Sequence, residues 1–164
     1  MGPAVTHDTA PKVRSLADAV AWRDRQPGPV VFTNGVFDLL HPGHVELLEA
    51  ARAQGAALVV AVNSDASARR LEKGPGRPVA GESARARVVS ALAAVDCVVL
   101  FDDDTPLAAI EALRPDVLVK GADYSRDRIV GADFVEGRGG RVVRIPLVAD
   151  QSSTRLVERA RGPS

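Results

Sequence analysis

Short apolar runs alternate along the chain with longer segments whose apolar residues recur at helical spacing. The runs are strand-sized and mostly free of polar residues, which is typical of strands buried on both faces of a parallel sheet. We predict strands at residues 30–32, 57–62, 97–100, 116–119 and 141–145. We predict helices at residues 16–22, 45–53, 64–71, 82–94, 105–113, 127–137 and 152–160. Each strand is therefore separated from the next by one or two helices.

This alternation predicts an α/β fold with a Rossmann-like, doubly wound, five-stranded parallel sheet in a single domain. A length of 164 residues suits one hydrophobic core. Residues 1–28 are expected to form an N-terminal tail and a short helix capped by Ser15, and residues 29–164 the main domain. In such sheets ligands bind beyond the carboxyl ends of the strands. Residues that directly follow a predicted strand are therefore the first candidates for a site.

Composition narrows the class of partner. The 21 basic and 21 acidic residues balance, so the basic excess of a general nucleic-acid binder is absent and no nucleic-acid partner is expected. The apolar runs are too short to span a membrane, and no signal-peptide pattern is visible, which favours a cytoplasmic protein. The single cysteine, Cys97, excludes an intrachain disulfide and lies in an apolar run typical of the core.

The segment from Thr33 to His44 follows the first predicted strand and contains two of the three histidines of the chain, His41 and His44. Pro42 suits the first turn of a helix, so both histidines should lie at a helix N-terminus, where free backbone amides and the helix dipole favour phosphate. Two other interpretations stay open at this point. The histidines could be incidental to an ordinary helix start, or they could form a metal pair, for which no further ligand is evident in the sequence.

Two further segments have both a structural and a functional interpretation. Ser64, between Asn63 and Asp65, could simply cap a helix, and substrate contact is compatible with capping. A loop rich in glycine and proline follows, with Lys73 and Arg77 among its basic residues. That loop is either a solvated surface segment or a lid that brings positive charge onto a phosphate.

The remaining candidates lie after the later strands. Lys120 is one of three lysines in an arginine-rich chain, and it directly follows the fourth predicted strand. Residues 152–154, Ser-Ser-Thr, should cap the last helix and could also bind phosphate oxygens. Asp102, Asp103 and Asp104 are expected to complement the dipole of the helix that follows rather than to bind a metal.

Several motifs together resemble one known family. They are TNGVFDLLHPGH (33–44), VNSD (62–65), GPGRP (74–78), FDDDTP (101–106), RPDVLVKGADY (114–124) and the SST segment (152–154). The chain resembles the D-glycero-β-D-manno-heptose 1-phosphate adenylyltransferase family of the HxGH nucleotidyltransferase superfamily, from about Leu16 to Arg161. It departs from that family at Val36, where cysteine is usual, at Gln151, where an aromatic residue is frequent, and at Ser153, where threonine is common.

The resemblance implies transfer of AMP from ATP to a sugar 1-phosphate, with release of pyrophosphate. It implies Mg²⁺ carried mainly by the ATP phosphates, no protein metal site, and a homodimer. The alternatives are cytidylyl transfer to glycerol 3-phosphate or a related alcohol phosphate, a non-catalytic nucleotide-binding module, and a scaffold subunit for a separate kinase.

The same resemblance assigns roles to residues. The catalytic residues would be His44, which stabilises the transition state, His41, which holds the triphosphate, and Lys73. The nucleotide-binding residues would be Thr33, Asn34, Gly35, Val36, Phe37, His41, Gly43, His44, Lys120, Ser152, Ser153 and Thr154. The substrate-binding residues would be Asp38, Asn63, Asp65, Arg77, Arg85 and Asp123. In the absence of a family role, Arg85 would form an ordinary surface salt bridge.

Overall fold

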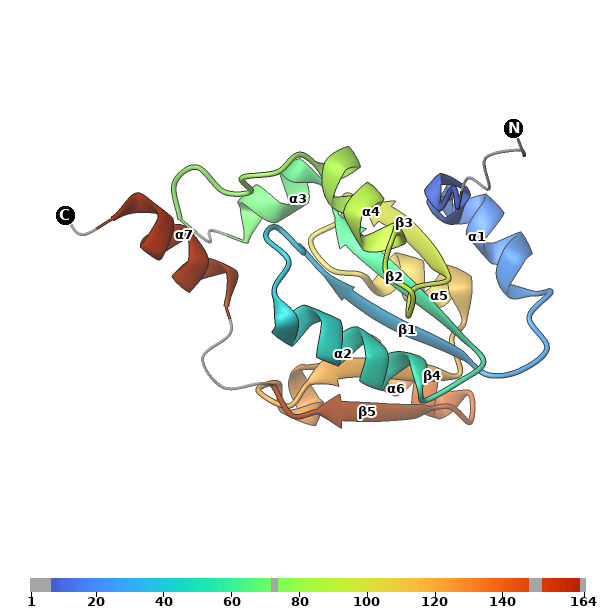
Figure 1. Cartoon of the computed structure of the whole chain (residues 1–164). Coiled ribbons are helices and arrows are strands. Elements are labelled where there is room, and N and C mark those ends of the chain that lie inside the picture. The colour runs from blue at the N-terminus through green and yellow to red at the C-terminus, as the bar shows by residue number, and fades with distance from the viewer. Residues whose placement is uncertain (1–6, 72–73, 148–151, 163–164) are drawn as a thin grey trace, which may run out of the picture.

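The computed structural model describes residues 7–71, 74–147 and 152–162. They form a five-stranded sheet in the order β3-β2-β1-β4-β5, in which every pairing is parallel (Figure 1). The strands are β1 (Val30–Gly35), β2 (Ala57–Asn63), β3 (Cys97–Phe101), β4 (Val117–Gly121) and β5 (Arg141–Ile145). The predicted fold class is therefore confirmed.

Helices cover both faces of the sheet. They are α1 (Leu16–Arg23), α2 (Pro42–Arg52), α3 (Asp65–Arg70), α4 (Glu82–Ser90), α5 (Leu107–Leu113), α6 (Ala132–Gly137) and α7 (Ser153–Arg161), with short 3₁₀ turns η1 (Ala10–Lys12) and η2 (Arg126–Arg128). Helices α2 and α4 lie in front of the sheet in Figure 1, and α5 and α6 lie behind it. All seven residues of β2 are buried, as expected of a central strand between two helical layers.

Alternate side chains of each strand supply two separate cores. Val59 and Ala61 of β2 pack towards α1, α5 and α6, whereas Leu58, Val60 and Val62 pack towards α2 and α4. The helix α1 contributes the fully buried Ala19 to the first of these cores. The boundary that we predicted between residues 28 and 29 stays a prediction.

Most predicted helix boundaries differ from the structure by one to five residues. The helix predicted at residues 127–137 is wrong in its first half, because η2 ends in an extended residue and Gly131 adopts a φ of +84° before α6 begins. The helix predicted at 82–94 ends at Ser90, and Pro106 is the residue before α5 rather than its first residue. The predicted capping by Ser15 and Ser64 is confirmed by bonds from Asp18 and Ser67 amides.

The strand order changes direction between β1 and β4. The chain runs outward from β1 through β2 to β3, and then crosses to the other side of β1 to form β4 and β5. At such a switch point the connections leave the carboxyl ends of two neighbouring strands in opposite directions, which opens a crevice for a ligand. No helix in the described part of the chain is long and apolar enough to cross a membrane.

Candidate active site

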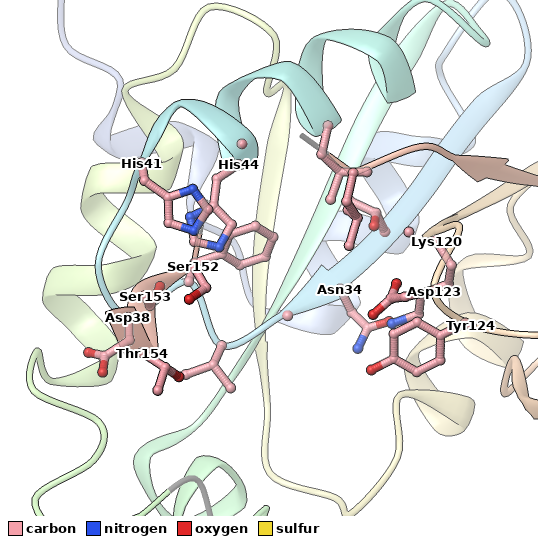
Figure 2. Close-up of a pocket in the computed structure, with 18 of the residues that line it drawn as sticks. Asn34, Asp38, His41, His44, Lys120, Asp123, Tyr124, Ser152, Ser153 and Thr154 are labelled. Atoms are coloured by element: carbon pink, nitrogen blue, oxygen red, sulfur yellow. The ribbon is translucent and has the colours of Figure 1, made fainter. Parts of the chain in front are cut away.

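A cavity of about 310 Å³ lies at the switch point, beyond the carboxyl ends of β1 and β4. Figure 2 shows His41, His44 and the start of α7 on one side of it, and Asn34, Lys120, Asp123 and Tyr124 on the other. The lining residues are Thr33, Asn34, Gly35, Val36, Phe37, Asp38, His41, Gly43, His44, Leu47, Arg77, Lys120, Gly121, Asp123, Tyr124, Leu147, Ser152, Ser153 and Thr154. Segments far apart in the sequence therefore converge on one cavity.

The two histidines form a stacked pair at the start of α2. Their ring centroids are 3.8 Å apart with an interplanar angle of 25°, and the ring of Phe37 lies 5.3 Å from His44. The helix begins at Pro42, as predicted, and His41 is its N-cap residue but forms no side-chain capping bond. An incidental capping role is therefore not supported for His41.

Protonation of His41 is unfavourable in the free protein. Burial lowers the pKa of His41 below its usual value of 6.5, so His41 is neutral at pH 7. Its Nδ1 atom is buried and has no hydrogen-bond partner among the described residues. Neutral imidazoles beside a cavity can still donate a hydrogen bond to a phosphate oxygen. Within the described residues, no group of three or more His, Cys, Asp or Glu side chains could hold a metal ion.

The backbone of the loop after β1 is shaped around this pair. Phe37 has a φ of +50°, which is rare for a bulky residue and often marks a functional segment. A Cβ atom at Gly35 would lie 3.0 Å from the ring of Phe37, tighter than an ordinary contact. Glycine at position 35 therefore leaves room for Phe37 to turn its ring towards His44.

Asp38 anchors the glycine- and proline-rich loop instead of facing solvent. Its carboxylate accepts hydrogen bonds from the Val79 amide at 2.8 Å and the Ala80 amide at 3.0 Å, and pairs with the Arg77 guanidinium at 2.7 Å. The Asp38 and Arg77 side chains are only 1% and 8% exposed. Burial raises the pKa of Asp38, but these three donors outweigh it and hold the pKa below the usual value of 3.8. Asp38 is therefore a buried anion with a complete set of donors.

Arg85 and Asp65 line neither this cavity nor the second one described below. Arg85 is 1% exposed, so the expected surface salt bridge is instead a buried one, with Nη2 of Arg85 lying 2.8 Å from Asp65. Its guanidinium also donates to the carbonyl oxygens of Val36 at 2.6 Å and Ala80 at 2.9 Å. The predicted contact of Asp65 and Arg85 with substrate stays a prediction, and the structure gives both residues a framework role.

The β1 and β4 side of the cavity offers polar atoms at different depths. The Thr33 hydroxyl donates to the Val119 carbonyl at 3.0 Å and so bridges the two strands. The Asn34 side-chain oxygen is buried without a hydrogen-bond partner among the described residues. The Lys120 ammonium lies 5.3 Å from the ring centre of Tyr124. Asp123 lies on the same wall, which therefore combines the amide of Asn34, the ammonium of Lys120 and the carboxylate of Asp123.

The start of α7 closes the opposite side. Ser152 caps the helix by accepting a hydrogen bond from the Arg155 amide at 3.1 Å, as predicted. The Ser153 hydroxyl donates to the Leu39 carbonyl at 2.8 Å, which ties α7 to the loop that carries the histidines. Two helix N-termini, of α2 and α7, therefore border one cavity, an arrangement that favours an extended anion.

A second cavity of about 380 Å³ adjoins the first. It shares Asn34, Gly35, Val36, Lys120 and Tyr124 with the first cavity. Its other lining residues are Asn63, Leu71, Phe101, Asp104, Thr105, Pro106, Arg128 and Val130. Of the predicted substrate-binding residues, only Asn63 lies here and not in the first cavity.

The acidic residues after β3 contact α3 and the residue that caps it. Asp102 accepts a hydrogen bond from the Ser64 hydroxyl, and Asp104 pairs with Arg70 at 2.6 Å. No side chain among the described residues caps α5, and its first turn contains no acidic residue. Asp102 and Asp104 therefore bond to Ser64 and Arg70 rather than complement the dipole of α5 as expected. Lys73 and Gln151 lie outside the described residues.

The sequence reasoning missed Leu47, Gly121, Tyr124 and Leu147 in the first cavity, and most of the second. Gly121 and Tyr124 carry the signal that found Lys120, since they follow the same strand. Arg128 carried no signal, because it was assigned to the interior of a continuous helix.

The chain is similar in sequence to curated proteins over most of its length. The chain is 62% identical over 145 residues to the bifunctional protein HldE of Gluconobacter oxydans (strain 621H), covering 88% of this chain and 30% of that protein. It is 55% identical over 163 residues to the bifunctional protein HldE of Mesorhizobium japonicum, covering 99% of this chain and 33% of that protein. The chain therefore spans about a third of the length of these curated relatives.

Solved structures share the fold. A lipopolysaccharide core biosynthesis protein from Thermoplasma volcanium superposes with a TM-score of 0.65 at 28% identity, covering 74% of this chain and 98% of the other. A pantoate-β-alanine ligase from Francisella tularensis matches in fold alone, with a TM-score of 0.56 at 10% identity, over 89% of this chain and 72% of the other. The cytidylyltransferase-like family model matches residues 32–157. The chain therefore belongs to the cytidylyltransferase-like family and is an enzyme of the nucleotidyltransferase type.

Proposed function

We propose that the chain transfers AMP from ATP to a sugar 1-phosphate, D-glycero-β-D-manno-heptose 1-phosphate, giving ADP-heptose and pyrophosphate. The observation that carries the proposal is the stacked histidine pair at the start of α2, which lies beside the start of α7 on one wall of the cavity at the switch point. The choice of heptose rests on the KGADY and GPGRP motifs and on the HldE relatives.

The chemistry requires little acid–base catalysis. An oxygen of the acceptor phosphate forms a bond to the α-phosphorus of ATP, and the bond from that phosphorus to the β-phosphate oxygen breaks. The electron pair leaves with pyrophosphate. The attacking phosphate is already anionic at neutral pH, so the main obstacles are repulsion between anions and the charge that develops on the α-phosphate. Positioning and preorganised donors should supply most of the rate enhancement.

Several groups around the cavity have a role in the proposed mechanism. His44 donates to the α-phosphate as its charge develops, and His41 holds the β- and γ-phosphates. The amides at the start of α7 and the hydroxyls of residues 152–154 bind further oxygens of the triphosphate. Lys120 lies where the two cavities join, and places positive charge between the two phosphates that react.

The residues present suit a Mg²⁺ ion that is carried mainly by the nucleotide. The described residues hold no three-ligand cluster, but the orphaned side-chain oxygen of Asn34 and the carboxylate of Asp123 both line the cavity. Hard oxygen ligands of this kind suit Mg²⁺, which usually retains phosphate and water ligands. When bound, the ion would neutralise charge on the triphosphate. The homodimer, the cytoplasmic location and a separate kinase partner stay predictions.

A substrate panel tests the proposal. Pyrophosphate release is measured for ATP, CTP, GTP and UTP against heptose 1-phosphate, mannose 1-phosphate, glucose 1-phosphate and glycerol 3-phosphate. We expect the highest kcat/KM for ATP with heptose 1-phosphate. A preference for CTP with glycerol 3-phosphate would replace the proposal with the alternative that the family description suggests. Nucleotide binding without pyrophosphate release from any pair would identify a non-catalytic module.

A further inference from the structure

We propose that the second cavity is the acceptor site, with Arg128 binding the acceptor phosphate and Thr105 binding a hydroxyl of the sugar. This assignment rests on the proposed function. The cavity has a volume of about 380 Å³, within the range of about 300–1,000 Å³ that is common for small-molecule sites.

The position of the second cavity fits the reaction. It meets the first cavity at Asn34, Gly35, Val36, Lys120 and Tyr124, so a molecule in each would meet at the ends of β1 and β4. The first cavity contains both histidines and the start of α7, which suit the triphosphate. The second contains neither, and it is bordered by the residue before α5 and by η2 on the other side of the sheet. Nucleotide and acceptor can therefore approach from opposite sides of the sheet edge.

The strand order places different chemistry at the two ends of the second cavity. On the β4 side lie two cations, Lys120 and Arg128. On the β2 and β3 side lie Asn63, Asp104 and Thr105, whose amide, carboxylate and hydroxyl groups suit sugar hydroxyls. A sugar phosphate has the same polarity, with a dianion at one end and hydroxyls along its length. The phosphate end then lies next to the first cavity, where it must react.

Arg128 is available for this role. It is exposed, and its guanidinium forms no ion pair or hydrogen bond with any described residue. Arg126, two residues earlier in the same turn, differs because its guanidinium pairs with Asp133 and Glu136 and lines neither cavity. Asp104 is already held by Arg70, which fixes its carboxylate without adding net negative charge to the acceptor end.

Thr105 is likewise exposed, and its hydroxyl bonds to no described residue. The apolar residues around it, Phe101, Pro106 and Leu71, give the C–H faces of a sugar ring a surface to pack on. Asn63 is 4% exposed and is held by a 2.9 Å bond from its amide to the Ser67 hydroxyl. A fixed amide beside a free hydroxyl is suited to distinguishing one sugar from another.

Steady-state kinetics of Arg128→Ala and Arg126→Ala test the phosphate contact. Loss of one charge-assisted hydrogen bond at a partly exposed site should raise KM for heptose 1-phosphate by about tenfold. KM for ATP should stay within about twofold, and the Arg126→Ala control should match the wild type in both constants. An equal rise in both KM values for Arg128→Ala, or no rise in either, would overturn the assignment.

Thr105→Val and Thr105→Ser test the hydroxyl contact. Valine removes the hydroxyl at nearly constant volume, so KM for the sugar phosphate should rise by about five- to tenfold, whereas serine should restore it. A valine variant with unchanged KM, or a serine variant as impaired as valine, would remove Thr105 from the site.

Calorimetry with heptose 1-phosphate and a non-hydrolysable ATP analogue separates the site from the reaction. Binding that is weakened in Arg128→Ala but not in Arg126→Ala, in a protein that shows no turnover, would retain the site and discard the proposed function. If neither substitution changes the kinetics of a protein that turns over, the proposed function would be retained and the acceptor site discarded. Absence of binding and of turnover in the wild type would overturn both.

Discussion

The buried pair between Asp38 and Arg77 should be one of the most stabilising polar contacts of the chain. The Asp38 carboxylate is 1% exposed, Arg77 is 8% exposed, and the two backbone amides of Val79 and Ala80 complete its donors. The matched perturbations are Asp38→Asn, which keeps the shape but removes the charge, and Arg77→Gln, which leaves the carboxylate with its amide donors alone.

Breaking one side of a buried pair typically costs about 3–5 kcal/mol, because an uncompensated charge stays behind. Here the cost should be nearer 2–4 kcal/mol, since the asparagine oxygen can still accept from one amide and the carboxylate in Arg77→Gln retains two amides. Residues 74–76 are exposed, so the loop can detach while the sheet stays folded. Part of the loss should therefore appear as a raised KM for ATP, because Asp38 and Arg77 both line the first cavity.

Urea denaturation at pH 7 measures the free energy of unfolding of each single variant and of the double variant. The double variant should lose at least about 1 kcal/mol less than the sum of the singles, because the residues share one interaction. Asp24→Asn is the control, since Asp24 pairs with Arg114 at 3.7 Å with both side chains about half exposed, and it should cost no more than about 0.5 kcal/mol. The reasoning is refuted if Asp38→Asn destabilises the protein no more than Asp24→Asn does.

The loss of stability in Asp38→Asn should depend on pH in a definite direction. The folded pKa of Asp38 lies below its usual value of 3.8, so its contribution is complete above the pKa of the unfolded carboxyl group. That contribution is lost as the pH falls through the folded pKa. The difference in unfolding free energy between the wild type and Asp38→Asn should therefore hold from pH 7 to about pH 5 and narrow steadily below about pH 4.

Three further substitutions test other parts of the structure. His44→Ala should lower kcat by about a hundredfold or more while the circular dichroism spectrum and thermal melt stay those of a folded protein, and wild-type turnover would remove His44 from the mechanism. His41 is neutral in the free protein, and a bound triphosphate should raise its pKa, so ATP binding should take up a proton and tighten as the pH falls from about 8 to about 6. Calorimetry in two buffers measures the uptake, which His41→Asn should abolish. Gly131 has a φ of +84°, and a Cβ atom there would lie 2.7 Å from the side chain of Ile110. Gly131→Ala should therefore lower the free energy of unfolding, measured in urea, by about 2–3 kcal/mol. A loss under about 0.5 kcal/mol would contradict the break in the helix before α6.

The sheet was predictable because strands β1 to β4 are almost entirely buried, whereas the edge strand β5 alternates exposed and partly buried residues. An apolar run such as residues 57–62 is too short for a buried helix and suits a strand covered on both faces, so the apolar pattern located each strand of the described residues. The helix ends were harder, since they depend on single residues. Gly131 and the buried Ile129 interrupt a pattern that otherwise continues at helical spacing, and only the packing of Ile129 in the core reveals the break.

The site was predictable to the extent that its residues follow strands. Asn34, Lys120 and Ser153 were found in this way, and the structure brings all three to one cavity. Side-chain direction was not predictable from the sequence. Asp65 also follows a strand closely, yet its carboxylate points to Arg85, because a buried guanidinium must be paired. Arg128 was not predicted to line a site, because it follows no strand directly. It reaches the second cavity only because the chain forms the turn η2 there.

Arg85 contacts the backbone of position 36, so this contact does not depend on whether valine or the cysteine usual in the resembled family stands there. The Val36 side chain is buried and apolar, so any polar role of that position falls to its backbone, and its carbonyl accepts a 2.6 Å hydrogen bond from Arg85. The same guanidinium holds the Ala80 carbonyl and Asp65, so one cation joins the loop after β1, the loop before α4 and the start of α3. Val36 borders both cavities, so Arg85 helps to shape both of them without lining either.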